Sequence, residues 1–148
     1  MNNPVLFLDI DGVLNPESHP VLSLVHEGFV FHPKAVNYLK KILNETNAFL
    51  VISSTWRIGR TLEEVKEIFS HYQLDSYIQD MTPFLDWDAT RGDEIKAYLM
   101  KRPDIKHFLI LDDDRDIDPF SHAHIWVNPL EGITEDVYKD MVNKLNQT

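Results

Sequence analysis

The sequence contains no cysteine, which excludes disulfide bonds and thiolate chemistry. This composition suits the cytoplasm, and we expect that location. Membrane signals are lacking as well. The N-terminus has no basic region, and its short apolar run is interrupted by Asp9, so we expect neither a signal peptide nor a membrane span.

Basic residues are also scarce: 14 lysines and arginines face 24 acidic residues, for a net charge of −10. Because neutralising phosphates requires clustered Lys and Arg, this balance disfavours tight, non-specific binding to nucleic acid. The length of 148 residues and a hydrophobic content of 43% fit a globular protein with its own core. We predict a single domain over residues 1–148.

The most informative stretch is the apolar run Val5–Leu8, which is followed by Asp9, Asp11 and Gly12. Such a run is typical of a strand buried on both faces, and in an extended chain the two carboxylates point to the same side. Neighbouring carboxylates repel each other unless a cation lies between them, which favours a divalent-metal site. Gly12 permits a sharp turn or a close approach to a ligand. A plain strand-to-turn junction is the alternative.

Strands and helices alternate along the chain, which predicts parallel crossovers and an α/β fold. Strands are predicted at 5–8, 49–52, 77–81, 107–111 and 123–127, and helices at 33–45, 61–71, from Arg91-Gly92-Asp93 to before Pro103, and after Thr134. Residues 13–32 are expected to form a hairpin or flap. We predict a three-layer, doubly wound, mainly parallel sheet of five strands.

Polar side chains end three of these strands. The first ends in Asp-x-Asp, the second in Ser53-Ser54 and the fourth in Asp112-Asp113-Asp114. A parallel sheet brings these ends to one edge, where Mg²⁺ would find the carboxylate oxygens that it prefers. Arg91, at a helix start, could complete a pocket for a doubly charged phosphate.

These motifs resemble the haloacid-dehalogenase-like (HAD) superfamily of phosphatases. The resemblance implies a HAD-like Rossmannoid fold and a two-step phosphoryl transfer, in which Asp9 attacks phosphorus and Asp11 acts as general acid and base. Ser53, with Ser54 as the neighbouring option, matches the motif that binds the transferring phosphoryl group, and Gly12 completes the first motif.

The resemblance also implies a Mg²⁺ site. Asp112 and Asp113 would hold the ion together with the carboxylate of the first motif's first aspartate and the main-chain carbonyl of its second. The family usually places a lysine in its third motif; Arg91 fits that position best here, and Lys96 is the competing choice. Arginine can clamp charge, although its geometry differs from that of lysine.

Neither gap between the motifs is long enough for an ordinary cap domain, so we expect an open site and a phosphorylated substrate that is large or protruding. Among uncapped relatives, Ser53–Arg57, Arg91–Ile95 and the Asp112 run look most like the phosphatase half of polynucleotide kinase/phosphatase enzymes. A nucleic-acid end is therefore a candidate substrate, although the acidic composition disfavours it. The oligomeric state is left open.

Two pairs of aromatic and basic residues keep alternatives. Trp56 and Arg57 are expected either to contact substrate or to provide packing and a surface charge. Phe84 and Trp87 could stack on a base, but burial statistics favour their anchoring a loop.

Two rival functions are a receiver-like signalling domain and a non-catalytic relative that binds phosphate or a partner. A receiver domain expects a phosphoacceptor Asp at the end of the third strand and a Lys at the end of the fifth. The fifth strand here ends at Val127-Asn128-Pro129, so the match is poor.

Overall fold

A computed structural model describes residues 3–17 and 31–147. The strands are β1 (Val5–Leu8), β2 (Phe49–Ile52), β3 (Ile78–Met81), β4 (Phe108–Asp112) and β5 (His124–Trp126). The α-helices are α1 (Pro33–Thr46), α2 (Leu62–Ser70), α3 (Arg91–Met100) and α4 (Glu135–Leu145). Short 3₁₀ turns are η2 (Thr55–Arg57), η3 (Asp75–Tyr77) and η4 (Ser121–Ala123).

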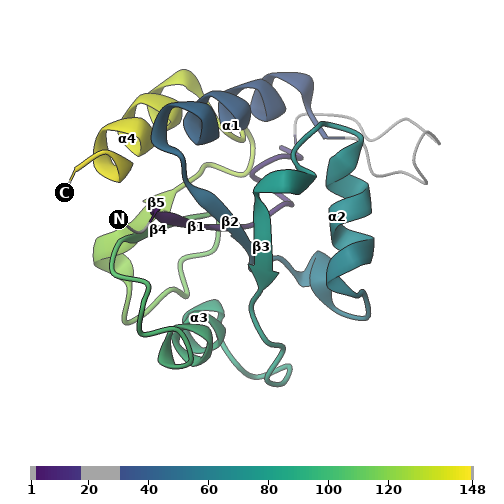
Figure 1. Ribbon diagram of the computed structural model, residues 1–148, viewed down its shortest axis with the longest axis vertical. Helices are drawn as coiled ribbons and strands as arrows, with labels where there is room; N and C mark the ends of the chain where they lie inside the picture. Colours follow the sequence, from purple (N-terminus) through teal and green to yellow (C-terminus); the bar gives the residue numbers. More distant parts are fainter. Residues whose placement is uncertain (1–2, 18–30, 148) are drawn as a thin grey trace.

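The five strands form one parallel sheet in the order β3-β2-β1-β4-β5. Side chains of α1, α2 and α4 join one hydrophobic core, whereas those of α3 join a second core on the opposite face (Figure 1). The predicted class, an uncapped three-layer α/β fold with a doubly wound five-stranded sheet, is confirmed.

The central strand β1 shows why both faces are covered. Leu6 and Leu8 lie in the core with α1, α2 and α4, and Val5 and Phe7 lie in the core with α3. All four side chains are buried, as expected when successive residues point to opposite faces of a sheet covered on both sides.

Local signals place most helix ends where the sequence predicts them. Pro33 begins α1, and Asn47 ends it in the left-handed conformation. Thr61 and Glu64 form a capping box at the start of α2, as the short pattern Thr61-Leu62-Glu63-Glu64 in the sequence indicates. The third and fifth strands start one residue later than predicted, because the 3₁₀ turns η3 and η4 take up the preceding residues.

The segment between β2 and α3 holds η2, α2, η3, β3 and a loop, which leaves no room for a folded cap. The flap or hairpin predicted for residues 13–32 lies mostly outside the described residues, which resume at Phe31. Within residues 3–17 and 31–147, no helix has the length and apolar character needed to cross a bilayer.

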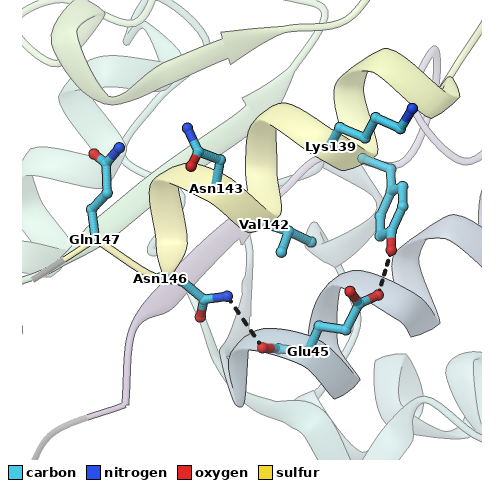
Figure 2. A pocket seen from close by; sticks show the side chains of 7 residues that line it. Glu45, Lys139, Val142, Asn143, Asn146 and Gln147 are labelled. Atoms are coloured by element: carbon cyan, nitrogen blue, oxygen red, sulfur yellow. Dashed lines mark hydrogen bonds between the residues drawn. The ribbon is translucent and has the colours of Figure 1, made fainter.

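Helices α1 and α4 pack side by side, and an open hollow of about 520 Å³ lies where they meet (Figure 2). The rings of Tyr38 and Tyr138 stack with centroids 5.6 Å apart. The amide of Asn146 donates a 3.4 Å hydrogen bond to the carbonyl of Glu45. These contacts attach the C-terminal helix to the fold.

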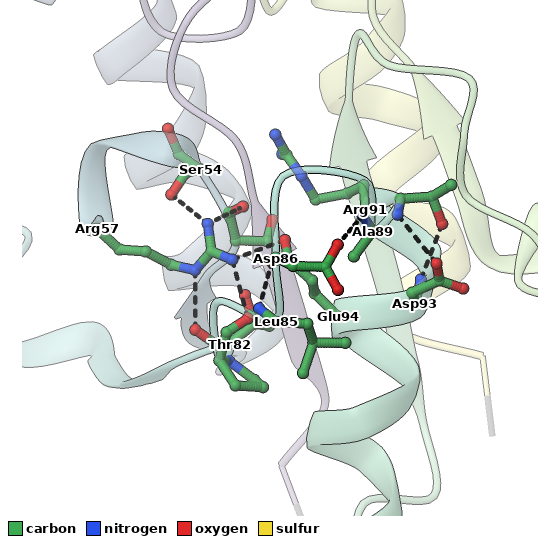
Figure 3. A network of polar contacts seen from close by, with 12 residues as sticks. Ser54, Arg57, Thr82, Leu85, Asp86, Ala89, Arg91, Asp93 and Glu94 are labelled. Carbon is green, nitrogen blue, oxygen red and sulfur yellow. Dashed lines mark hydrogen bonds and ion pairs between the residues drawn. The ribbon is translucent and has the colours of Figure 1, made fainter. Parts of the chain in front are cut away.

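Arg57 is buried behind the strand ends, with only 2% of its side chain exposed. Its donors reach Thr82 O (2.8 Å), Ser53 O (3.2 Å), Ser54 O (2.9 Å), Pro83 O (3.0 Å) and Glu94 Oε1 (2.7 Å) (Figure 3). A guanidinium has five N–H donors, so none is left for a ligand. The sequence left two roles open for Arg57, substrate contact or packing with a surface charge. In the structure its side chain ties the end of β2 to the loop after β3 and to α3.

Arg57→Met should lower the free energy of unfolding by about 3–5 kcal/mol, because it leaves the Glu94 carboxylate and four backbone carbonyls without their donor. Urea denaturation measures the change. Arg102→Met is the matched control, because the Arg102–Asp104 pair is 33% and 55% exposed and its loss should cost much less stability. Equal losses in the two variants would contradict the assigned role of Arg57.

Candidate active site

Three carboxylates meet where β1 and β4 end. Asp9 directly follows β1, and its N–H donates a 3.1 Å hydrogen bond to the carbonyl of Leu111 in β4. Asp112 is the last residue of β4, and Asp113 follows it. Carboxylate oxygens of the three aspartates lie within 4.8 Å of one another. In a doubly wound sheet, ligands bind at the carboxyl ends of the strands, between the two central strands where the strand order reverses. The three carboxylates lie at this point.

Arg91 provides positive charge against this cluster. Its Nη1 lies 2.7 Å from Asp112 Oδ2 and 3.3 Å from Asp9 Oδ1. Burial opposes the charge of Arg91, but the two carboxylates outweigh it and raise the pKa of the guanidinium above its usual range. Lys96, the competing choice, is exposed further along α3 and makes no ion pair within the described part of the chain. The structure therefore brings Arg91 to the cluster.

Gly92 allows the start of α3 to approach the loop after β4. A Cβ on this residue would lie 2.1 Å from the carbonyl oxygen of Asp118 and 2.7 Å from the carbonyl carbon of Ile117. The Gly92 N–H also donates a 2.9 Å hydrogen bond to the carbonyl of Asp116. No side chain fits there, so glycine fixes how closely Arg91 approaches the acidic residues.

The acidic cluster favours a cation. Burial, and then the nearby Asp9, raise the pKa of both Asp112 and Asp113 well above the usual carboxyl range, although Arg91 counteracts this for Asp112. The Asp112 carboxylate is also oriented by a 2.9 Å hydrogen bond from the N–H of Asp114. Closely spaced carboxylate oxygens are what Mg²⁺ binds, so this donor set fits the predicted ion.

Gly12 makes room for one of these carboxylates. Its φ of +81° is one that side-chain-bearing residues rarely adopt, and a Cβ there would lie 2.5 Å from Asp113 Oδ2. The sequence predicts that Gly12 permits a sharp turn or a close approach to a bound substrate. In the structure its lack of a side chain lets the first-motif turn pack against Asp113.

Asp11 stands apart from the three clustered carboxylates. Its side chain is exposed, and Asp11 Oδ2 accepts a 2.9 Å hydrogen bond from the indole Nε1 of Trp56. The Trp56 ring in turn lies 5.6 Å from the ring of Phe31. Sequence reasoning left Trp56 between substrate contact and packing, whereas the structure makes it a hydrogen-bond donor that orients Asp11.

The two serines after β2 have different surroundings. Ser54 Oγ accepts a 3.2 Å hydrogen bond from the N–H of Trp56 and thereby caps η2. Ser53 Oγ is fully buried and has no hydrogen-bond partner among the described residues, and the hydroxyl of Thr82 shares this state. A buried hydroxyl without a partner is uncommon and fits a ligand oxygen. Ser53 is thus better suited than Ser54 to contact a phosphoryl group.

Two residues of β5 support the backbone of Asp112 and Asp113 and were not identified from the sequence. His124 Nε2 donates to the carbonyl of Asp112 at 3.0 Å, and Trp126 Nε1 donates to the carbonyl of Asp113 at 2.9 Å. The guanidinium carbon of Arg115 lies 4.2 Å from the centroid of the Trp126 ring. His124 and Trp126 are two residues apart, which puts both side chains on one face of a strand. This spacing was the only signal for their shared role in the sequence.

Residues 5–137 match the family described as HAD domain in Swiss Army Knife RNA repair proteins. No curated protein and no solved structure gave a significant match. The family match runs from β1 into α4 and so includes every strand end that contributes to the site. It confirms the resemblance to HAD-like phosphatases. The chain therefore belongs to the family of HAD domains found in Swiss Army Knife RNA repair proteins.

Proposed function

We propose that this protein is a Mg²⁺-dependent phosphomonoesterase that acts through an aspartyl-phosphate on Asp9. The observation that supports this proposal most is the meeting of Asp9, Asp112 and Asp113, with carboxylate oxygens within 4.8 Å of one another and Arg91 against two of the three. Phosphoryl transfer requires mainly a positioned nucleophile and positive charge around the equatorial oxygens.

In the first step, a carboxylate oxygen of Asp9 attacks phosphorus while Asp11 gives its proton to the leaving oxygen. In the second step, Asp11 takes a proton from water, and the resulting hydroxide attacks the phosphorus of the aspartyl-phosphate to release inorganic phosphate and restore Asp9. A carboxylate nucleophile needs no base to activate it. The covalent intermediate replaces one difficult displacement by two easier ones. The buried Ser53 hydroxyl and the Arg91 guanidinium are suited to bind the phosphoryl oxygens.

Asp9, Asp112 and Asp113 would hold the metal ion. When bound, Mg²⁺ supplies positive charge that offsets the carboxylates and stabilises the negative phosphoryl oxygens. Gly12 and Arg91 prepare this site, since the first leaves space for Asp113 and the second fixes the Asp112 carboxylate.

We further propose that the phosphate is carried by a nucleotide or by an RNA end. The family description refers to RNA repair proteins, and the segment between β2 and α3 forms no cap over the site. With a net charge of −10, the protein would repel a long nucleic-acid strand laid along its surface. Recognition of a strand terminus is therefore favoured over recognition of a continuous strand. A receiver-like domain fits less well, because β3 is an edge strand and Arg91 comes from the start of α3 instead of the end of β5.

Asp9→Asn should reduce turnover of an aryl phosphate in the presence of Mg²⁺ by about 10³-fold or more, because the amide cannot form the acyl phosphate. Thermal unfolding of the variant should remain cooperative, which separates loss of chemistry from loss of fold. Asp140→Asn, an exposed change on α4, is the matched control and should retain full activity. Comparable turnover by Asp9→Asn would refute the covalent mechanism, and no turnover by the unchanged protein would favour a non-catalytic relative.

Mg²⁺ at about 100 times its Kd should raise the melting temperature by about 5–10 °C, because an ion that binds the folded state stabilises it. Asp112→Asn should remove this rise, and a metal chelator should remove it from the unchanged protein. Glu67→Gln on the exposed face of α2 is the control and should preserve it. A full Mg²⁺-dependent rise in the Asp112→Asn variant would exclude this residue as a ligand.

Trp56→Phe should lower kcat for an alkyl phosphate by about 10-fold, a part of the 10²- to 10⁴-fold that a positioned general acid contributes. The indole N–H that orients Asp11 is lost, while the aromatic contact with Phe31 is kept. An aryl phosphate should be affected much less, because its leaving group needs little protonation. An equal loss on both substrates would point to a purely structural role for Trp56.

A further inference from the structure

A groove of about 310 Å³ opens beside the acidic cluster. Arg91 and Asp114 line it on the side of the cluster, and Phe84, Asp86 and Trp87 line it from the loop between β3 and α3. The groove is therefore continuous with the place where we propose that the phosphate binds. Its volume is at the small end of the range for ligand sites, which suits one small ring system.

Trp87 is the most exposed of the large hydrophobic side chains in the described part of the chain, at 81%. The expectation that it anchors the loop by burial is wrong. The edge contact with Phe84, at a centroid distance of 4.7 Å, leaves most of the indole in solvent. An exposed tryptophan face next to a polar groove is suited to stack on a planar ring.

The backbone around Trp87 is held in place although the side chain is free of the core. Asp86 Oδ1 accepts hydrogen bonds of 2.8 Å from the N–H groups of Asp88 and Ala89, which form a tight turn. The N–H of Leu85 donates a 3.1 Å hydrogen bond to the same Glu94 carboxylate that binds Arg57, as Figure 3 shows. The indole is thus presented by a fixed loop, which lowers the entropic cost of binding.

The charges of the groove indicate what kind of ring it accepts. Five acidic residues line it: Asp86, Asp88, Glu94, Asp114 and Asp116. Its two arginines are already paired, Arg57 with Glu94 and Arg91 with the acidic cluster. A second phosphate would be repelled, whereas a neutral ring with N–H donors would find both a stacking face and acceptors.

We propose that this groove binds the nucleobase of the nucleotide whose phosphate is hydrolysed, with the base stacked on Trp87. The inference rests on the proposed phosphatase function and specifies the part of the substrate that gives selectivity. A base with exocyclic amino groups, such as guanine, matches the carboxylates best. The groove has room for one terminal nucleotide, and the carboxylates that line it would repel further phosphates.

The test compares guanosine monophosphates with glycerol phosphate, which has no base. Trp87→Ala should lower the ratio of kcat/KM for the nucleotide to that for glycerol phosphate by about 5- to 100-fold, the range expected for a lost stacking contact, mainly through KM. Trp87→Phe should restore most of the ratio. Met100→Ala, which removes another side chain that is 75% exposed, is the control and should leave the ratio unchanged.

A ratio that stays within about twofold in Trp87→Ala would overturn the base site while leaving the phosphatase function intact. If neither phosphate is hydrolysed, the proposed function fails, and equilibrium binding of guanosine monophosphate then decides the groove separately. Binding that is weakened in Trp87→Ala but not in Met100→Ala would support the base site, and binding that is equal in all variants would overturn it.

Discussion

The ion pair of Arg91 with Asp9 and Asp112 is the interaction on which the geometry of the site depends. Carboxylates that meet at the end of a buried sheet repel one another, and burial adds to the cost of their charge. The guanidinium, 2.7 Å from Asp112 and 3.3 Å from Asp9, offsets part of that cost and holds the first and fourth strands' acids in one orientation. The absence of a side chain at Gly92 makes this approach sterically feasible.

Arg57 and Arg91 lie near the same edge of the sheet but have different roles. Arg57 donates most of its hydrogen bonds to backbone carbonyls and holds three segments together. Arg91 instead pairs with carboxylates, at a position that a ligand can reach. Burial lowers the pKa of Arg57, while the acidic cluster raises that of Arg91. Arg57 thus holds the scaffold together, whereas Arg91 faces the clustered carboxylates.

The sequence was sufficient for features that depend on local signals. The buried strand Val5–Leu8, the capping box at Thr61 and the acids at the ends of β1 and β4 all follow from short patterns, and the structure has them where they were predicted. The role of Arg57 could not be predicted, because it depends on Glu94, which is distant in sequence. The hydrogen bond from Trp56 to Asp11 and the exposure of Trp87 are likewise products of tertiary packing.

The loop between β3 and α3 is fixed at both of its ends. Arg57 binds the carbonyls of Thr82 and Pro83 at the first end, and the capping box of Thr90 and Asp93 secures the second. Residues 84–89 lie between these anchors, so we expect substitutions of exposed side chains there, such as Trp87, to leave the acidic cluster in place. Related chains that keep both anchors but differ in residues 84–89 would share the same arrangement of carboxylates and differ in the substrates that they prefer.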